Sequence, residues 1–133
     1  MIKTFYVGVK GFIVQGDKVL LLHKAGGNFW EAPGGRIDGD ETIEEALDRE
    51  LHEEVPNIKD IRIGDIVGAH RLPKDIDGDK SLTLIYYLVS AGFDGDPQIS
   101  DEHDNWQWAS KDEVMKLLVE KEQLVKAVFS KVK

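Results

Sequence analysis

The chain contains no cysteine among its 133 residues. Disulfide bonds and thiolate metal sites are therefore excluded, and the absence fits a reducing compartment. Long apolar runs are also missing, since none approaches the roughly 20 residues that span a bilayer. The first residues, MIKTFYVGVKGFIV, alternate and include lysines, so we expect no signal peptide. Together these absences predict a cytoplasmic protein.

Basic residues are in the minority. Lys and Arg number 17 against 25 Asp and Glu, which gives a formal net charge of −8. A nucleic-acid polymer is held largely by a basic face, so we do not expect one as a partner. If the ligand is a phosphate compound, metal ions must supply the positive charge. The length suits one domain over residues 1–133 with a core of its own.

Apolar segments alternate with turn residues along the whole chain. They predict strands over residues 4–14, 18–23, 29–32, 58–69, 81–90 and 105–109. Gly8 and Gly11 suggest a bulge or bend in the first strand. Trp106 and Trp108 lie in the last strand, where we expect one to point inward and the other outward. Two helices follow it: one is capped at Ser110, and the other includes Leu124 and Val128.

A third helix, rich in glutamate, is predicted between the first and second halves of the chain. Thr42 with Glu45 forms a capping box, so the helix begins near Ile43, and Pro56 ends it. Its apolar stripe consists of Ile43, Ala46, Leu47 and Leu51. At about 100° per residue, Glu50 and Glu54 fall inside this stripe and Glu53 falls on its edge. Carboxylates on the core side are costly unless a cation or hydrogen bonds satisfy them.

A divalent metal is the first candidate for that cation. Glu50 and Glu54 are four residues apart and Glu53 is three from Glu50, so their oxygens can converge. Hard oxygen ligands of this kind suit Mg²⁺, and Mn²⁺ is possible. Because Mg²⁺ keeps waters and is shared with substrate phosphates, an incomplete protein cage is expected.

The motif around this helix resembles the Nudix box. Gly35, Glu41 and the segment Arg49-Glu50-Leu51-His52-Glu53-Glu54 have the spacing of that box, although Pro56 stands where the family pattern has a glycine. The preceding Trp30-Glu31-Ala32-Pro33-Gly34-Gly35 also resembles the family's usual lead-in. The resemblance implies an α/β fold, a Nudix-type α/β/α sandwich with a mixed central sheet. The acidic helix is then expected on one side and the C-terminal helices on the other.

The resemblance also implies a reaction. It is the Mg²⁺-dependent hydrolysis of the pyrophosphate linkage in a nucleoside diphosphate joined to another group. Nucleoside triphosphates, dinucleoside polyphosphates, ADP-ribose and nucleotide sugars all remain possible substrates. The implied metal ligands are the carbonyl of Gly34 and the carboxylates of Glu50, Glu53 and Glu54. A Nudix-fold nucleotide-binding or regulatory protein without turnover is the alternative, and a homodimer is possible.

Two questions about the catalytic residues stay open at this point. By spacing alone Arg49 forms surface ion pairs, whereas the resemblance implies that it orients a catalytic carboxylate. Glu41 is then a structural partner at the helix start. The general base is either Glu53 or Glu102, because the segment before Trp106 resembles a loop that supplies the base in some relatives. A solvated acidic loop is the other interpretation of Glu102.

Candidates for substrate binding come from four separate places. Lys24 follows the second strand and either meets a phosphate or is solvated. Trp30 precedes the Pro-Gly-Gly turn and either stacks on a base or packs in the core. Arg71 and Tyr87 are further candidates for substrate contact.

Overall fold

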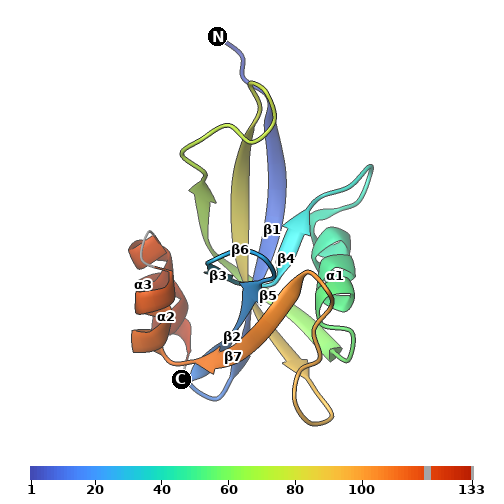
Figure 1. The fold of residues 1–133 in the computed structure, drawn as a ribbon, viewed down its shortest axis with the longest axis vertical. Coiled ribbons are helices and arrows are strands. Elements are labelled where there is room, and N and C mark those ends of the chain that lie inside the picture. The colour runs from blue at the N-terminus through green and yellow to red at the C-terminus, as the bar shows by residue number, and fades with distance from the viewer. Residues whose placement is uncertain (119–120, 133) are drawn as a thin grey trace.

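The computed structural model describes residues 1–118 and 121–132. Among these residues strands are the commonest regular structure, and three helices interrupt or follow them (Figure 1). The elements are β1 (Phe5–Gln15), β2 (Lys18–Lys24), β3 (Trp30–Glu31), β4 (Gly34–Arg36), α1 (Ile43–Glu54), β5 (Lys59–Arg71), β6 (Ser81–Gly92), β7 (His103–Ala109), α2 (Lys111–Leu117) and α3 (Glu122–Lys131). None of the helices within these residues is long and apolar enough to cross a lipid bilayer.

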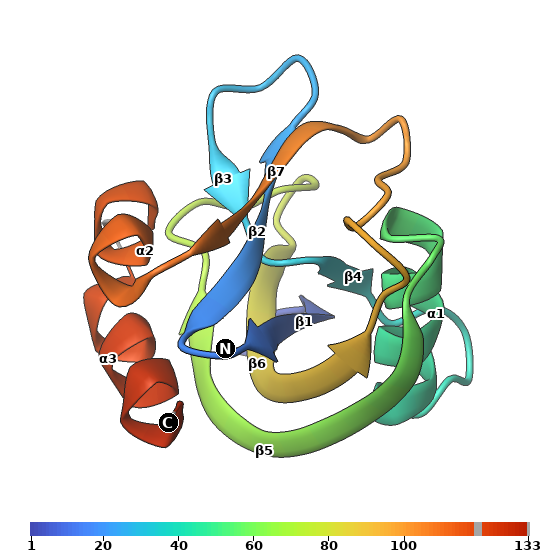
Figure 2. The ribbon, with the colours of Figure 1, turned by 90° about the horizontal axis from the view of Figure 1, so that it is seen from below.

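Within the described residues the strands form one mixed sheet of seven. The main order is β3-β2-β1-β6-β5, with β4 paired to β1 and β7 paired to β2 (Figure 2). The central pair β1 and β6 is parallel, and the other pairs are antiparallel. The predicted bulge in the first strand is wrong, because β1 pairs with β6 from Phe5 to Val14 without a register shift. Gly8 and Gly11 instead make room for Leu84 and Val89, whose side chains lie 2.6 and 2.9 Å from where a Cβ would be.

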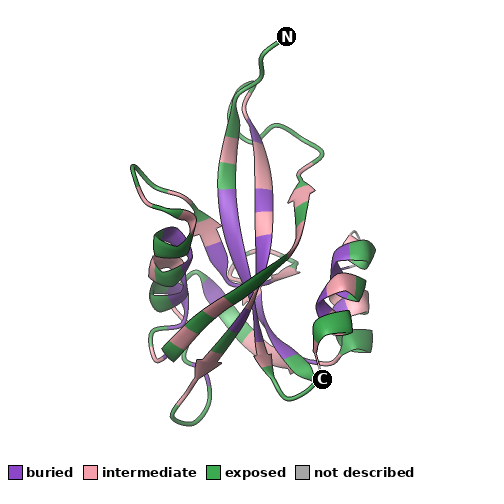
Figure 3. Cartoon of the chain, turned by 180° about the vertical axis from the view of Figure 1, so that it is seen from behind, coloured by how far each residue is buried: buried purple, intermediate pink, exposed green. Residues whose placement is uncertain are grey.

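The sheet has a core on each face. One core contains Val9, Ile13, Leu47, Leu51 and other apolar residues, and it lies under α1. The opposite core contains Phe12, Leu84, Val125 and Val128 and is covered by α2 and α3. Figure 1 shows the two groups of helices on opposite sides of the strands, and Figure 3 shows buried residues concentrated along the central strands and the inner helix faces. The α/β/α sandwich with a mixed sheet is confirmed.

The two tryptophans of β7 do not point in opposite directions. Trp106 and Trp108 both pack against the core beneath α1. Side chains two residues apart on a strand share a face, so the expectation of one inward and one outward ring was wrong.

The predicted ends of α1 are confirmed. The Thr42 hydroxyl accepts the N–H of Glu45, and the Glu45 carboxylate accepts the N–H of Thr42, at 3.1 and 3.0 Å. At the other end Val55 is the C-cap with φ −129°, and its N–H donates to the carbonyl of Leu51. A second capping box starts α2, between Ser110 and Glu113. Each box satisfies N–H groups that the first turn of a helix leaves unpaired.

Candidate active site

The last two turns of α1 carry the glutamates at different depths. Glu54 is 4% exposed and belongs to the buried face of α1, whereas the Glu53 side chain is 58% exposed. Glu50 lies between these extremes, with 15% of its side chain exposed. The helical period therefore places one carboxylate in the core, one at the boundary and one at the surface. The order agrees with the predicted stripe.

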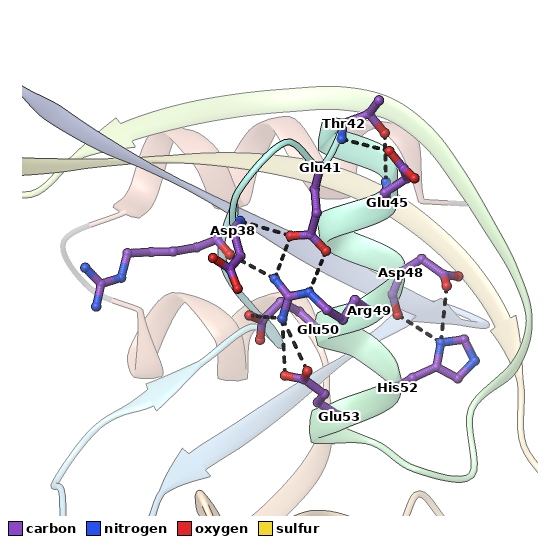
Figure 4. Close-up of polar contacts among 10 residues, drawn as sticks. Asp38, Glu41, Thr42, Glu45, Asp48, Arg49, Glu50, His52 and Glu53 are labelled. Carbon is purple, nitrogen blue, oxygen red and sulfur yellow. Dashed lines mark hydrogen bonds and ion pairs between the residues drawn. The ribbon is translucent and has the colours of Figure 1, made fainter.

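Arg49 links Glu50 and Glu53 to the start of the helix (Figure 4). Its Nε and Nη2 donate to the two oxygens of Glu41, at 2.6 and 2.9 Å. Its Nη1 donates to Glu50 at 2.9 Å and lies 3.3 Å from both oxygens of Glu53. The hydrogen bonds that the guanidinium donates to Glu41 raise its pKa further above the ordinary value for arginine. Arg49 thus holds two carboxylates of the acidic helix toward each other, which a solvated surface pair would not do.

Gly34 and Gly35, which the sequence suggested as a turn and which begin β4, lie directly against these carboxylates. The N–H of Gly34 donates to Oε1 of Glu54 at 3.0 Å. A Cβ on Gly35 would lie 2.5 Å from the carboxyl carbon of Glu50, and one on Gly34 would lie 2.0 Å from the carbonyl oxygen of Val9. Gly34 also has a φ of 142°, which side chains disfavour. Glycine is therefore required at Gly34 for the close approach to β1 and at Gly35 for the close approach to Glu50 on α1.

Beneath the turn is a buried polar network that the sequence analysis missed. Nζ of Lys10 lies 3.1 Å from Oε1 of Glu31 and 3.3 Å from the carbonyl oxygen of Gly34. Oε2 of Glu31 pairs with Nε2 of His103 at 2.9 Å. Nε2 donates in this bond because a carboxylate oxygen accepts, and among the described residues Nδ1 of His103 has no hydrogen-bond partner. The only signal in the sequence was Lys10 itself, a charge within the apolar stretch of the first strand.

This network surrounds Glu54 with charge. Burial raises the pKa of Glu54 to about 7, although Lys10, the Gly34 N–H and His103 each lower it. For Glu31 burial also acts to raise the pKa, but the hydrogen bond with His103 and the Lys10 ammonium outweigh it, and the pKa falls to about 2. The two carboxylates thus differ sharply in how readily they ionise, because Glu31 hydrogen-bonds to both Lys10 and His103, whereas Glu54 forms no ion pair with any described residue.

The donor set fits a hard divalent cation. Glu50 and Glu53 share one nitrogen of Arg49, and Glu54 contacts the backbone of Gly34, so three carboxylates and a backbone turn are adjacent. Oxygen donors of this kind are what Mg²⁺ and Mn²⁺ prefer. Within residues 1–118 and 121–132, no three acidic or histidine side chains already converge as a complete metal-binding group. In this structure the candidate oxygen ligands are paired with protein cations. Arg49 contacts Glu50 and Glu53, and Lys10 contacts the carbonyl of Gly34.

Glu102 lies on a loop that is fastened to the same helix. The N–H of Ser100 donates to the carbonyl of Glu54 at 3.1 Å, and the carbonyl of Glu102 accepts the N–H of Ala25 at 2.9 Å. The loop between β6 and β7 therefore runs past the end of α1 that carries the glutamates, while the Glu102 side chain itself is exposed.

A cavity of about 600 Å³ adjoins the turn on the side covered by α2. Its lining is mostly apolar and aromatic, and includes Trp30, Leu84 and Tyr86, with Lys10, Gly35 and Arg36 as its link to the turn. The volume is in the range of small-molecule sites. The cavity provides space for an organic group, and its connection to the acidic helix is Gly35, which packs against Glu50.

The four candidates for substrate binding are not brought together. Trp30 lines this cavity and also meets His23 edge to face, with ring centroids 5.2 Å apart. Tyr87 is buried in the core beneath α1, and its neighbour Tyr86 lines the cavity instead. Arg71 lies over the Phe5 ring at 4.9 Å, and Lys24 ends β2 beside β7. Neither Arg71 nor Lys24 lines the cavity.

Fold and site together define an α/β protein whose acidic helix packs against the Gly34-Gly35 start of β4. The family model described as NUDIX domain matches residues 4–129. The chain therefore belongs to the Nudix family, and the resemblance found in its sequence is confirmed.

Several known proteins are similar to this chain. An RNA pyrophosphohydrolase of Marinomonas sp. (strain MWYL1) is 36% identical over 118 residues, covering 75% of this chain and 73% of the relative. An 8-oxo-dGTP diphosphatase of Proteus vulgaris is 42% identical over 65 residues, covering 48% of this chain and 53% of the relative. The chain thus spans only about half the length of that relative. The solution structure of the E. coli ORF135 protein superposes with a TM-score of 0.78 at 25% identity, covering 96% of this chain and 91% of the other.

Proposed function

We propose that this protein hydrolyses the pyrophosphate linkage of a small nucleotide with the help of a divalent metal, Mg²⁺ or Mn²⁺. The observation that carries the proposal is the arrangement of Glu50, Glu53 and Glu54 around Arg49 and the Gly34 turn, beside a largely apolar cavity. Acidic side chains so close together need cations, and a nucleotide supplies phosphates that share those cations. The cavity supplies space for the base.

Each residue has a distinct part in this proposal. The carboxylates of Glu50, Glu53 and Glu54 and the carbonyl of Gly34 would hold the metal. When bound, the metal neutralises charge on the phosphate oxygens and lowers the pKa of an attacking water. Arg49 orients Glu50 and Glu53 through Nη1, and Glu41 fixes the guanidinium at its other edge. Trp30 offers a ring face for stacking within the cavity.

The general base is either Glu53 or Glu102. Glu53 is exposed and held by Arg49, so its carboxylate can accept a proton from a water above the helix. Glu102 belongs to the loop whose Ser100 N–H contacts the end of α1. Both are close enough to the acidic helix to be tested by substitution, and a base must come within hydrogen-bond reach of the water.

Two observations support the proposed substrate class: the names of similar proteins and the net charge of this chain. The Proteus vulgaris relative is an 8-oxo-dGTP diphosphatase, which favours a nucleoside triphosphate. The Marinomonas relative is an RNA pyrophosphohydrolase, so RNA is the second candidate. A net charge of −8 opposes binding along a nucleic-acid backbone, which needs a basic face. We therefore favour the free nucleotide, acting in the cytoplasm.

A substrate panel tests the proposal. Wild-type protein is incubated with dGTP, 8-oxo-dGTP, ADP-ribose, a nucleotide sugar, a dinucleoside polyphosphate and a short 5′-triphosphate RNA, each with and without Mg²⁺. Metal-dependent product release from a free nucleotide is expected. Release from the RNA alone would replace the proposed substrate class. A lack of turnover with every compound, together with nucleotide binding, would favour the regulatory alternative.

Variants then assign the roles. Glu53→Gln and Glu54→Gln should each lower kcat by roughly 100-fold or more while the circular dichroism spectrum is unchanged. Glu44→Gln is the matched control, since it removes one charge from an exposed position of the same helix. If Glu102→Gln lowers kcat as much as Glu53→Gln, then the loop supplies the base. Wild-type rates in both helix variants would refute the metal site. Sedimentation of the wild-type protein tests the homodimer.

A further inference from the structure

Arg36 stands at the boundary between the cavity and the acidic helix. It follows Gly34-Gly35 in β4 and lines the cavity of about 600 Å³ that contains Trp30. It also lines a second cavity, of about 400 Å³, together with Tyr6, Arg49 and Glu50. Arg36 is the lining residue that the two cavities share, so a ligand that extends from the first cavity into the second comes next to it.

The guanidinium of Arg36 is held in place by an aromatic ring. Its central carbon lies 4.7 Å from the centroid of the Tyr6 ring, which is a cation–π distance. The Tyr6 hydroxyl donates to Oδ2 of Asp77 at 2.7 Å, and Asp77 belongs to the loop between β5 and β6. Asp77 is itself fixed there, because its carbonyl accepts the N–H of Lys80 at 2.9 Å. The position of Arg36 is thus set by residues outside the acidic helix.

Arg36 differs from the other cations near the site in its partners. Arg49 contacts Glu41, Glu50 and Glu53, and Lys10 is paired with Glu31. Among residues 1–118 and 121–132, no carboxylate forms an ion pair with Arg36, although the chain carries 25 Asp and Glu. Its nitrogens therefore remain available to an anionic ligand, while those of Arg49 and Lys10 are already used.

We propose that Arg36 binds the phosphate chain of the substrate, and that Tyr6 and Asp77 are positioning residues that aim its guanidinium. The ligand class is a nucleotide with two or more phosphates, whose base lies in the larger cavity. A guanidinium suits this role because its planar donors match phosphate oxygens. The inference rests on the proposed function, and it adds a protein cation to the charge that the metal supplies.

The first test distinguishes a direct contact between Arg36 and the phosphates from the effect of losing one positive charge anywhere on the protein. Arg36→Gln is compared with Arg62→Gln, an equal loss of charge at an exposed position of β5 that does not line either of these cavities. Two measurements are made with Mg²⁺: the affinity for inorganic triphosphate by calorimetry, and KM and kcat for dGTP. Loss of one charge-assisted contact should weaken triphosphate binding and raise KM by about 10-fold to 100-fold. The change in kcat should stay within about threefold, because such a contact binds ground and transition states alike.

The outcomes are distinct. Arg36→Lys should recover part of the affinity, since it restores the charge without the planar donors. An Arg36→Gln variant within twofold of wild type in triphosphate affinity overturns the inference, as does an equal effect of Arg62→Gln. If no compound is hydrolysed, the proposed function fails, but triphosphate binding still decides the role of Arg36.

The second test concerns Tyr6. Tyr6→Leu removes the ring and should raise KM roughly threefold to tenfold, whereas Tyr6→Phe keeps the ring and should have a smaller effect. In the Arg36→Gln background Tyr6→Leu should have no further effect, because a positioning residue acts through the group that it positions. Additive effects in the double variant would mean that Tyr6 acts independently of Arg36, which would refute the positioning role.

Discussion

Replacing Glu31 with glutamine removes the centre of the buried polar network. The Glu31 carboxylate accepts from Nζ of Lys10 and pairs with Nε2 of His103, at 3.1 and 2.9 Å. The side chains of these two partners are only 9% and 1% exposed, so water replaces the lost acceptor poorly, although Lys10 adjoins the cavity. A glutamine offers one oxygen where the carboxylate offers two, and its amide group would face a second donor. Glu31→Gln therefore leaves a buried donor without a partner.

The magnitude follows from the pKa of Glu31. Although burial acts to raise it, the contacts with His103 and Lys10 lower the pKa from 4.5 to about 2. At roughly 1.4 kcal/mol per unit, folding favours the ionised form by on the order of 3 kcal/mol. Because the pKa is lower in the folded state, this stabilisation is complete above about pH 4.5. It is lost as the pH falls from there toward about 2.

Urea unfolding, followed by tryptophan fluorescence between pH 7 and pH 2.5, measures the effect. The free energy of unfolding of Glu31→Gln should lie about 3 kcal/mol below that of wild type at pH 7. The gap should narrow below about pH 4.5, since protonated Glu31 resembles glutamine. Glu122→Gln is the control, because it breaks only an exposed pair with Lys126 and should cost less than about 0.5 kcal/mol. A gap that is equal at pH 7 and pH 3 would refute the reasoning.

Three further substitutions test the local geometry of the site. Gly35→Ala places a Cβ 2.5 Å from the Glu50 carboxyl carbon; the carboxylate must move, and kcat for the best panel substrate should fall roughly 100-fold. Arg49→Lys keeps the charge but loses the paired bonds to Glu41; kcat should fall by about tenfold or more with an unchanged circular dichroism spectrum. Thr42→Ala removes the cap of α1 and should lower the free energy of unfolding by about 1 kcal/mol in urea without affecting KM.

The parts of this protein that sequence predicts well are those set by near neighbours. The start of α1 depends on Thr42 and Glu45, three residues apart. The depths of Glu50, Glu53 and Glu54 follow from the helical period and the apolar residues beside them. Local hydrogen bonds and a repeating pattern are properties of a short segment, so no knowledge of the remaining chain was needed.

The buried network depends instead on contacts between distant segments. Glu31 is 21 residues from Lys10 and 72 from His103, and the three meet only because β1, β3 and β7 all adjoin β2. Sheet order decides such a meeting, and the sequence analysis did not predict that order. The same limit applies to Tyr86 and Tyr87, since which tyrosine faces the cavity follows from the register of β6 against β1.

Pro56 stands where the sequence analysis expected the family pattern to have a glycine, and α1 ends just before it without one. The helix keeps its hydrogen bond from the Val55 N–H to the Leu51 carbonyl, and Val55 ends it at φ −129° without a left-handed residue. Proline has no N–H to contribute, but its place lies one residue beyond that last bond. The carbonyl of Glu54, left free at the helix end, accepts the N–H of Ser100. This bond ties the loop that carries Glu102 to the turn that carries Glu53 and Glu54, so both candidates for the general base are positioned by the same helix terminus.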